Sequence, residues 1–145
     1  MNRRPAHRHK LPLLLAVALA LLGMSAASAE DLSGYTGAQL FQRFCASCHG
    51  KTGEGDGPVA PFFKLLPPDL TEISRRSGGT FPADRVRRIL DGRENPPPHG
   101  AREMPVWGMD FAMSADDPAR GNAVAQTAIA QLVDYLRSIQ KPPRR

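Results

Sequence analysis

The sequence predicts an all-α domain with three main helices and long loops. Near the C-terminus, apolar residues recur at the helical spacings of four and three over residues 117–140; they are Ala125, Ile129, Leu132, Leu136 and Ile139. No stretch shows a convincing strand pattern. The 14 prolines and 13 glycines instead divide the chain into long loops, above all between residues 50 and 79.

The other two main helices have recognisable starts. Thr36 and Gln39 have the spacing of a capping box, which predicts a helix running toward residue 45. A further helix is expected over residues 82–91, with Pro82 in its first turn and Gly92 after its end. We also expect a short helical turn near residues 70–75.

The first 29 residues have the features of a cleavable export signal. An apolar run over residues 11–24 precedes the small residues at 27–29, and the basic residues before it are Arg3, Arg4, Arg8 and Lys10. An uncleaved membrane anchor is the alternative, but the run is shorter than the roughly 20 residues that a spanning helix needs. Residues 30–145 would then form one domain in the periplasm or another exported compartment.

Most of the excess positive charge lies in this leader. Four of the 19 Lys and Arg residues and none of the 14 Asp and Glu residues precede residue 30, so removing it lowers the net charge from +5 to +1. Nothing in the remaining composition indicates a nucleic-acid partner. With the leader cleaved, we expect no stable membrane insertion.

Both cysteines lie in the motif C-x-x-C-H, formed by Cys45, Cys48 and His49. This is the attachment sequence of c-type haem. Residues three apart share one face of a helix, so both thiols can reach the same side of a porphyrin. His49 follows as the proximal ligand of the iron. The motif therefore predicts one haem c covalently bound through Cys45 and Cys48.

Three other readings of this region are less well supported. A thioredoxin-like dithiol would follow a strand in a βαβ unit, which the sequence lacks. A structural zinc site would need all four Cys and His side chains of the chain after the leader, including His99, which lies 50 positions from His49. The Gly-Lys-Thr at residues 50–52 lacks the earlier glycine and the following helix of a phosphate-binding loop.

In its motifs the chain resembles the class I cytochromes c, small single-haem electron carriers, over residues 33–140. The supporting features, besides C-x-x-C-H, are Gly37-x-x-x-Phe41, Tyr135-Leu136, Gly-x-Gly-Pro at 55–58 and Met-Pro-Val-Trp-Gly at 104–108. The resemblance implies a cytochrome c fold wrapped around the haem, with the first and last helices in contact. It also implies that the carbonyl of Pro58 accepts a hydrogen bond from His49. The proline-rich stretch between Pro58 and Gly79 departs from the family pattern.

The resemblance implies Met104 as the sixth iron ligand. Met104 lies in a predicted loop and precedes Pro105, and a thioether ligand raises the reduction potential. His99 is the rival ligand. Met109 and Met113 are expected to fill the core. Trp107 is expected to pack on the haem or bond a propionate, with a plain core position as the alternative.

These features predict a periplasmic electron carrier rather than an enzyme, expected to be a monomer. Its partners would be redox proteins: a dehydrogenase, a quinol-oxidising complex or a terminal oxidase. The alternatives are a bound electron-transfer subunit of such a complex and a haem-based ligand sensor. Arginines between residues 75 and 93 form either a docking face for an acidic partner or the solvated side of a helix.

Overall fold

The computed structural model describes residues 32–94, 104–115 and 117–142. The predicted leader and His99 lie outside these residues. The helices of the described segments are α2 (Gly37–Phe44), α3 (Ala46–His49), α4 (Ile73–Arg76), α5 (Ala83–Leu90), α6 (Trp107–Ala112) and α7 (Pro118–Ser138). Three short 3-10 helices accompany them: η1 (Leu32–Gly34), η2 (Ala60–Phe62) and η3 (Leu70–Glu72). No strand occurs in these segments, and the all-α prediction is confirmed.

The predicted helix starts are confirmed by their caps. The Thr36 hydroxyl accepts a hydrogen bond from the Gln39 backbone at 3.3 Å, and Gln39 Oε1 accepts one from the Thr36 backbone at 2.9 Å. Each bond satisfies an N–H group that the first helical turn leaves without a partner. Asp117 caps α7 by accepting a bond from the Arg120 backbone at 2.9 Å, with Pro118 at the first helical position.

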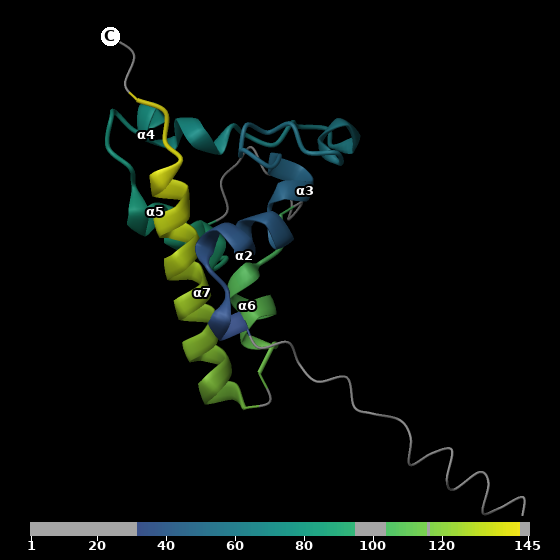
Figure 1. Cartoon of the computed structure of the whole chain (residues 1–145), viewed down its shortest axis with the longest axis vertical. Helices are drawn as coiled ribbons and strands as arrows, with labels where there is room; N and C mark the ends of the chain where they lie inside the picture. Colours follow the sequence, from purple (N-terminus) through teal and green to yellow (C-terminus); the bar gives the residue numbers. More distant parts are fainter. Residues whose placement is uncertain (1–31, 95–103, 116, 143–145) are drawn as a thin grey trace, which may run out of the picture.

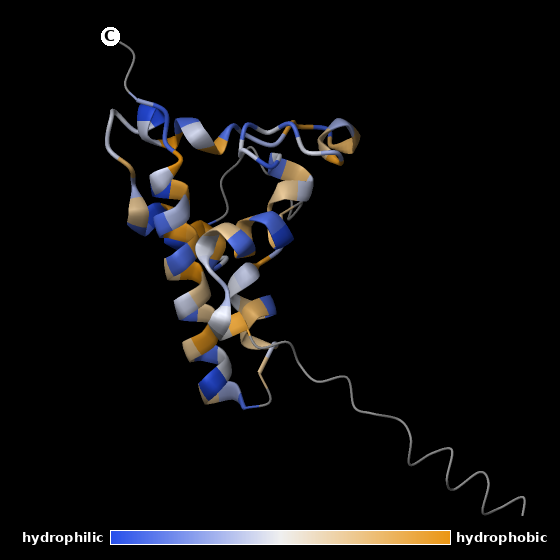
Figure 2. Cartoon of the chain, in the orientation of Figure 1, coloured by the Kyte–Doolittle hydropathy of each residue, from blue (hydrophilic) through white to orange (hydrophobic). Residues whose placement is uncertain are grey.

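Helix α7 is the element on which α2, α5 and α6 pack (Figure 1). Its side chains Ile129, Leu132 and Val133 are almost completely buried. The Phe41 ring of α2 lies against the Tyr135 ring of α7, with centroids 5.1 Å apart. Hydrophobic and hydrophilic residues alternate along α7 (Figure 2), and its buried residues include Ala125, Ile129 and Leu136. The core therefore forms around the face predicted from the sequence spacing.

Helix α6 was not predicted, and it corrects the expectation for two methionines. Phe111 is 1% exposed and faces the core, whereas Met109 and Met113 are 61% and 70% exposed. These two methionines are four residues apart, so they share the face of the helical turn that points away from Phe111. The prediction that they fill the core was wrong.

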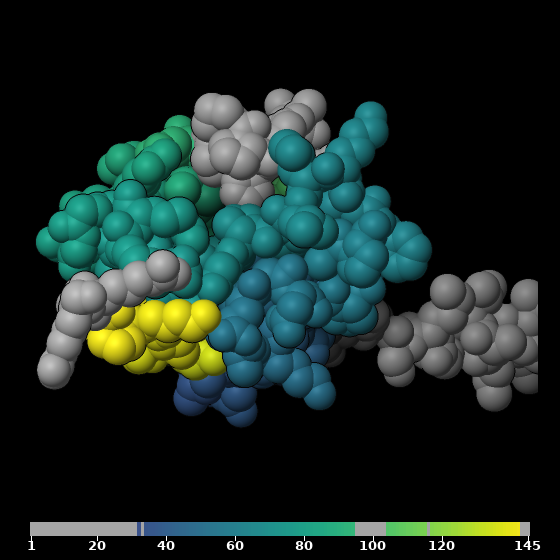
Figure 3. Space-filling view, turned by 90° about the horizontal axis from the view of Figure 1, so that it is seen from above, coloured from purple at the N-terminus to yellow at the C-terminus, as the bar shows by residue number. Residues whose placement is uncertain are grey.

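The loop after α3 leaves the helices as a long arm and returns to them at η3 and α4 (Figure 1). These two short helices confirm the helical turn expected near residues 70–75. The C-terminal end of the described chain lies beside this loop (Figure 3). There the Lys141 backbone N–H donates to the Thr71 carbonyl at 2.8 Å.

Candidate haem site

The junction of α2 and α3 positions the C-x-x-C-H residues. Cys45 ends α2 by donating its backbone N–H to the Phe41 carbonyl at 2.9 Å, and its own carbonyl accepts from the His49 backbone at 2.9 Å. The near-continuous helical backbone places Cys45 and Cys48 one turn apart. Their thiols are free and not joined to each other. Both thiols are thus available on one side of the site.

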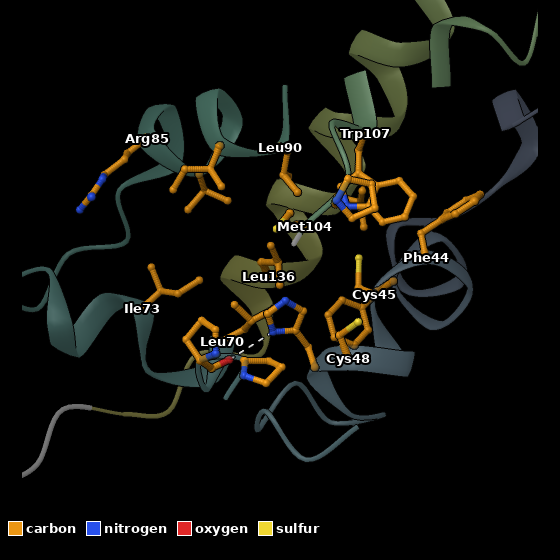
Figure 4. A pocket seen from close by; sticks show the side chains of 18 of the residues that line it. Phe44, Cys45, Cys48, Leu70, Ile73, Arg85, Leu90, Met104, Trp107 and Leu136 are labelled. Carbon is orange, nitrogen blue, oxygen red and sulfur yellow. Dashed lines mark hydrogen bonds between the residues drawn. The ribbon is translucent and has the colours of Figure 1, made fainter. Parts of the chain in front are cut away.

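One cavity of about 360 Å³ brings together the predicted attachment and ligand residues. Cys45, Cys48, His49 and Met104 all line it, and Figure 4 shows the side chains of Cys45, Cys48 and Met104 around it. Leu and Ile side chains from the helices form much of the remaining wall, with Leu70, Leu90 and Leu136 among them. This size and apolar character are typical of cofactor sites, which have volumes of roughly 300–1,000 Å³.

The carbonyl beside His49 belongs to Pro68, not to Pro58. The Nδ1 atom of His49 lies 3.2 Å from the Pro68 carbonyl oxygen, shown as the dashed line in Figure 4. The segment around Pro58 is instead bonded to the backbone of α3: Gly57 donates to the Cys48 carbonyl, and Val59 to the Ser47 carbonyl. Those bonds hold Pro58 against the helix, so the prediction that Pro58 accepts from His49 was wrong.

This hydrogen bond fixes the roles of the two imidazole nitrogens. A carbonyl oxygen can only accept, so Nδ1 carries the proton and the lone pair of the neutral ring lies on Nε2. His49 is 7% exposed, which limits competition from water for this bond. Such a partner orients a metal-binding histidine and strengthens it as a donor. The imidazole is therefore prepared to bind a metal through Nε2.

Burial controls the protonation of Cys45. Desolvation, reinforced by the nearby Cys48, raises the pKa of the Cys45 thiol to about 12. Because the thiolate is the reactive form, a buried neutral thiol is protected from oxidation and exchange. In the chain without haem, Cys45 is therefore a neutral thiol at neutral pH, whereas in the haem protein its sulfur forms a thioether bond.

Three aromatic rings stabilise one end of the cavity. Trp107 lies 5.4 Å from Phe44 and 5.8 Å from Phe111 between centroids, and Phe44 lies 5.1 Å from Phe111. These separations are in the range of favourable aromatic pairs. Trp107 also lines the cavity, so its core packing and its access to a cofactor are compatible. Its contact with the haem stays a prediction.

Among the described residues of the cavity wall, the charged ones are Arg76 and Arg85, and Arg85 is paired with Glu94, which lies outside the wall. A guanidinium group binds carboxylates through paired hydrogen bonds, so Arg76 suits a haem propionate. Together with the two thiols, the imidazole and the thioether, the lining fits a haem c.

Ion pairs neutralise part of the arginine-rich region. Arg85 and Arg88 contact the two carboxylate oxygens of Glu94 at 2.7 and 3.0 Å, and Arg93 contacts Asp91 at 2.6 Å. The hydrogen bond from Arg85 keeps the pKa of Glu94 below its ordinary value, and the hydrogen bond from Arg88 has a smaller effect in the same direction. These pairs lower the charge that this face offers, and a docking role for it stays a prediction.

An all-α domain with C-x-x-C-H on an apolar cavity defines a c-type cytochrome. The chain matches the cytochrome c family over residues 35–140. It therefore belongs to that family, in its class I form, and carries covalently attached haem c with iron in an electron-transfer role. No curated protein and no solved structure gives a match in the other two comparisons.

The described residues lack two further features. In residues 32–94, 104–115 and 117–142, no three His, Cys, Asp or Glu side chains are grouped to hold a metal ion. Within the same segments, no helix has the length and apolar character needed to cross a membrane.

The cavity also reveals residues that the sequence reading missed. Pro68 had a signal in the pair Pro67-Pro68, because a proline pair in a loop favours a fixed backbone. Phe44, Val86 and Leu90 lie in the predicted helices, but nothing in their spacing distinguished a cavity wall from a core. Ile73 and Leu70, in the short helical turn, had no signal that placed them opposite α5.

Proposed function

We propose that this cytochrome is an exported electron carrier that binds its haem through Cys45 and Cys48 and its iron through His49 and Met104. The observation that carries the proposal is the convergence of these four side chains on one apolar cavity. Haem c supplies a one-electron ferric/ferrous couple. Held by His49 and Met104, the iron would have no ligand position left for a substrate, which favours a carrier over an enzyme.

The chain's own residues have distinct roles in this proposal. His49 donates Nε2 to the iron while its Nδ1 proton is held by Pro68. The Met104 thioether favours the ferrous state over what a second histidine would give. The apolar wall limits water around the metal, and a low local dielectric disfavours the additional positive charge of the ferric form. The thioether and the apolar wall both favour a raised reduction potential.

Optical spectra of the purified haem protein test the ligation. We expect a red charge-transfer band, characteristic of methionine on ferric iron, and no change in the reduced spectrum on adding carbon monoxide. Rapid carbon monoxide binding would instead indicate an open sixth position. That outcome would contradict the proposed carrier function and favour a ligand sensor.

Two further measurements address the site of action and the partner. Export predicts a periplasmic protein whose mass corresponds to residues 30–145 plus one haem, whereas an anchored protein would retain the leader. A free carrier is expected to elute as a monomer and to exchange electrons with a purified quinol-oxidising complex. Stable co-purification with a larger redox protein would favour the bound-subunit alternative.

A further inference from the structure

The C-terminal end of α7 holds the segment that follows Pro68. This segment comprises Asp69, the 3-10 helix η3 and the start of α4. Gln140 lies 70 positions after Leu70 but donates its side-chain N–H to the Leu70 carbonyl at 2.8 Å. Its Oε1 accepts the backbone N–H of Ser74 at 2.8 Å. Gln140 therefore bridges the beginning and the end of one turn.

The Gln140 amide has no ambiguity in its orientation. Its Nε2 donates to the carbonyls of Leu70 and Leu136, at 2.8 and 2.6 Å, which uses both of its hydrogens. Its oxygen accepts from Ser74, a backbone group that can only donate. The reverse orientation would set donor against donor and acceptor against acceptor. The side chain thus fastens α7 to the loop in one geometry.

Lys141 strengthens the same attachment from outside. Its backbone N–H donates to the Thr71 carbonyl at 2.8 Å, and its ammonium contacts Asp69 at 3.1 Å and Glu54 at 2.9 Å. On the opposite side, the Leu70 backbone N–H donates to the Gly53 carbonyl at 2.7 Å. The residues directly after Pro68 are therefore fixed from both directions.

This attachment bears on His49 because Pro68 is the next residue but one before Leu70. The position of the Pro68 carbonyl depends on where Asp69 and Leu70 are held. A shorter, better aligned bond from Nδ1 gives the imidazole more electron density, which stabilises the ferric state and lowers the potential. A carbonyl that drifts away from Nδ1 has the opposite effect.

We propose that Gln140 is a positioning residue for the proximal histidine: it holds the 69–74 segment so that the Pro68 carbonyl stays on His49 Nδ1. It thereby keeps the potential lower than the His49 and Met104 ligands alone would set it. The inference rests on the proposed function, because it requires His49 to be the proximal ligand.

The test is the substitution Gln140→Met, which keeps the approximate side-chain volume and removes all three hydrogen bonds. At a fixed solution potential we expect the ferrous-to-ferric ratio to rise about threefold. This corresponds to a shift of roughly +28 mV in the midpoint potential, since a one-electron couple shifts by 59 mV for each tenfold change in that ratio. The His49 ring N–H of the ferrous protein should also exchange faster with solvent, as measured by NMR.

Gln42→Met is the matched control. Gln42 also donates its amide to a loop carbonyl, that of Lys51 at 2.8 Å, but this bond does not hold the 69–74 segment. We expect the reduction potential and the His49 N–H exchange rate of Gln42→Met to equal those of the wild type. If Gln140→Met folds poorly, Gln140→Asn provides a milder loss, because the shorter amide cannot span Leu70 and Ser74 together.

The outcomes separate this inference from the proposed function. A wild type without the His/Met spectrum would overturn the proposed function itself. With that spectrum present, an unchanged or lowered potential in both Gln140 variants would overturn the inference, whatever their melting temperatures. An equal shift in Gln42→Met would do the same, because it would show a general loosening of the loops.

Discussion

Gly37 of α2 lies directly against the backbone of Gln131 in α7. A Cβ atom at position 37 would be 2.1 Å from the Gln131 carbonyl oxygen and 2.9 Å from the Tyr135 Cβ. Real Cβ atoms do not approach backbone so closely, so α2 and α7 can cross at this distance only with glycine at that position. The crossing also sets where Cys45, at the end of α2, and His49, at the end of α3, meet the cavity.

Gly37→Ala should separate the two helices and destabilise the haem protein by about 1–3 kcal/mol, the usual cost of overpacking. Denaturant unfolding of the purified protein measures this loss. Gly34→Ala is the control, since a Cβ there meets nothing within 4 Å. Equal stability of the two variants would mean that the helix crossing tolerates a side chain.

Gly55→Ala should cost more stability than Gly78→Ala. Both glycines have a left-handed φ, +85° and +73°, so either alanine incurs about 1–2 kcal/mol of backbone strain. Only at position 55 would the new Cβ also lie 2.4 Å from a carbonyl, that of Pro67. Thermal unfolding of both variants checks the difference. Similar losses would show that the arm moves to accommodate the clash.

Met104→Ala should remove the red charge-transfer band and allow the reduced protein to bind carbon monoxide. The physical reason is the loss of the sixth ligand that we propose. Met113→Ala is the control, because that side chain is 70% exposed and its removal should change the unfolding free energy by less than about 0.5 kcal/mol. If carbon monoxide bound to the control but not to Met104→Ala, the assignment of Met104 as the sixth ligand would be wrong.

The contact between Asp69 and Lys141 should make stability depend on pH at both extremes. Burial raises the pKa of Asp69, but hydrogen bonds from Thr71 and Lys141 outweigh it and hold that pKa below its ordinary 3.8. Hydrogen bonds to Glu54 and Asp69 raise the pKa of Lys141 above its ordinary 10.5.

The signs of the two effects follow from linkage. The Asp69 contribution is present above pH 3.8 and is lost as the pH falls through the lowered pKa, while the Lys141 contribution is present below pH 10.5 and is lost as the pH rises through the raised one. As the pH is lowered, the melting temperature of Asp69→Asn should fall less steeply than that of the wild type, which gives it a shallower acid limb. Asp134→Asn, at an exposed pair with Arg137, should retain the wild-type acid limb.

Much of the fold was predictable because its signals are local. The capping box at Thr36 and the apolar repeat of α7 depend on residues three or four apart, and the structure confirms both. Helix α6 gave no such signal. It has six residues, too few for a full apolar repeat, and it forms where Phe111 packs beside α7. The exposure of Met109 and Met113 follows from that packing.

The sequence alone determined the cofactor chemistry of this protein, because the spacing of Cys45, Cys48 and His49 is fixed within one helical turn. It also determined the helices that form the core. Only the tertiary structure decided which carbonyl meets His49 and what Gln140 holds. Those contacts join residues 19 to 70 positions apart. They depend on how the loops pack on α7, which no local spacing specifies.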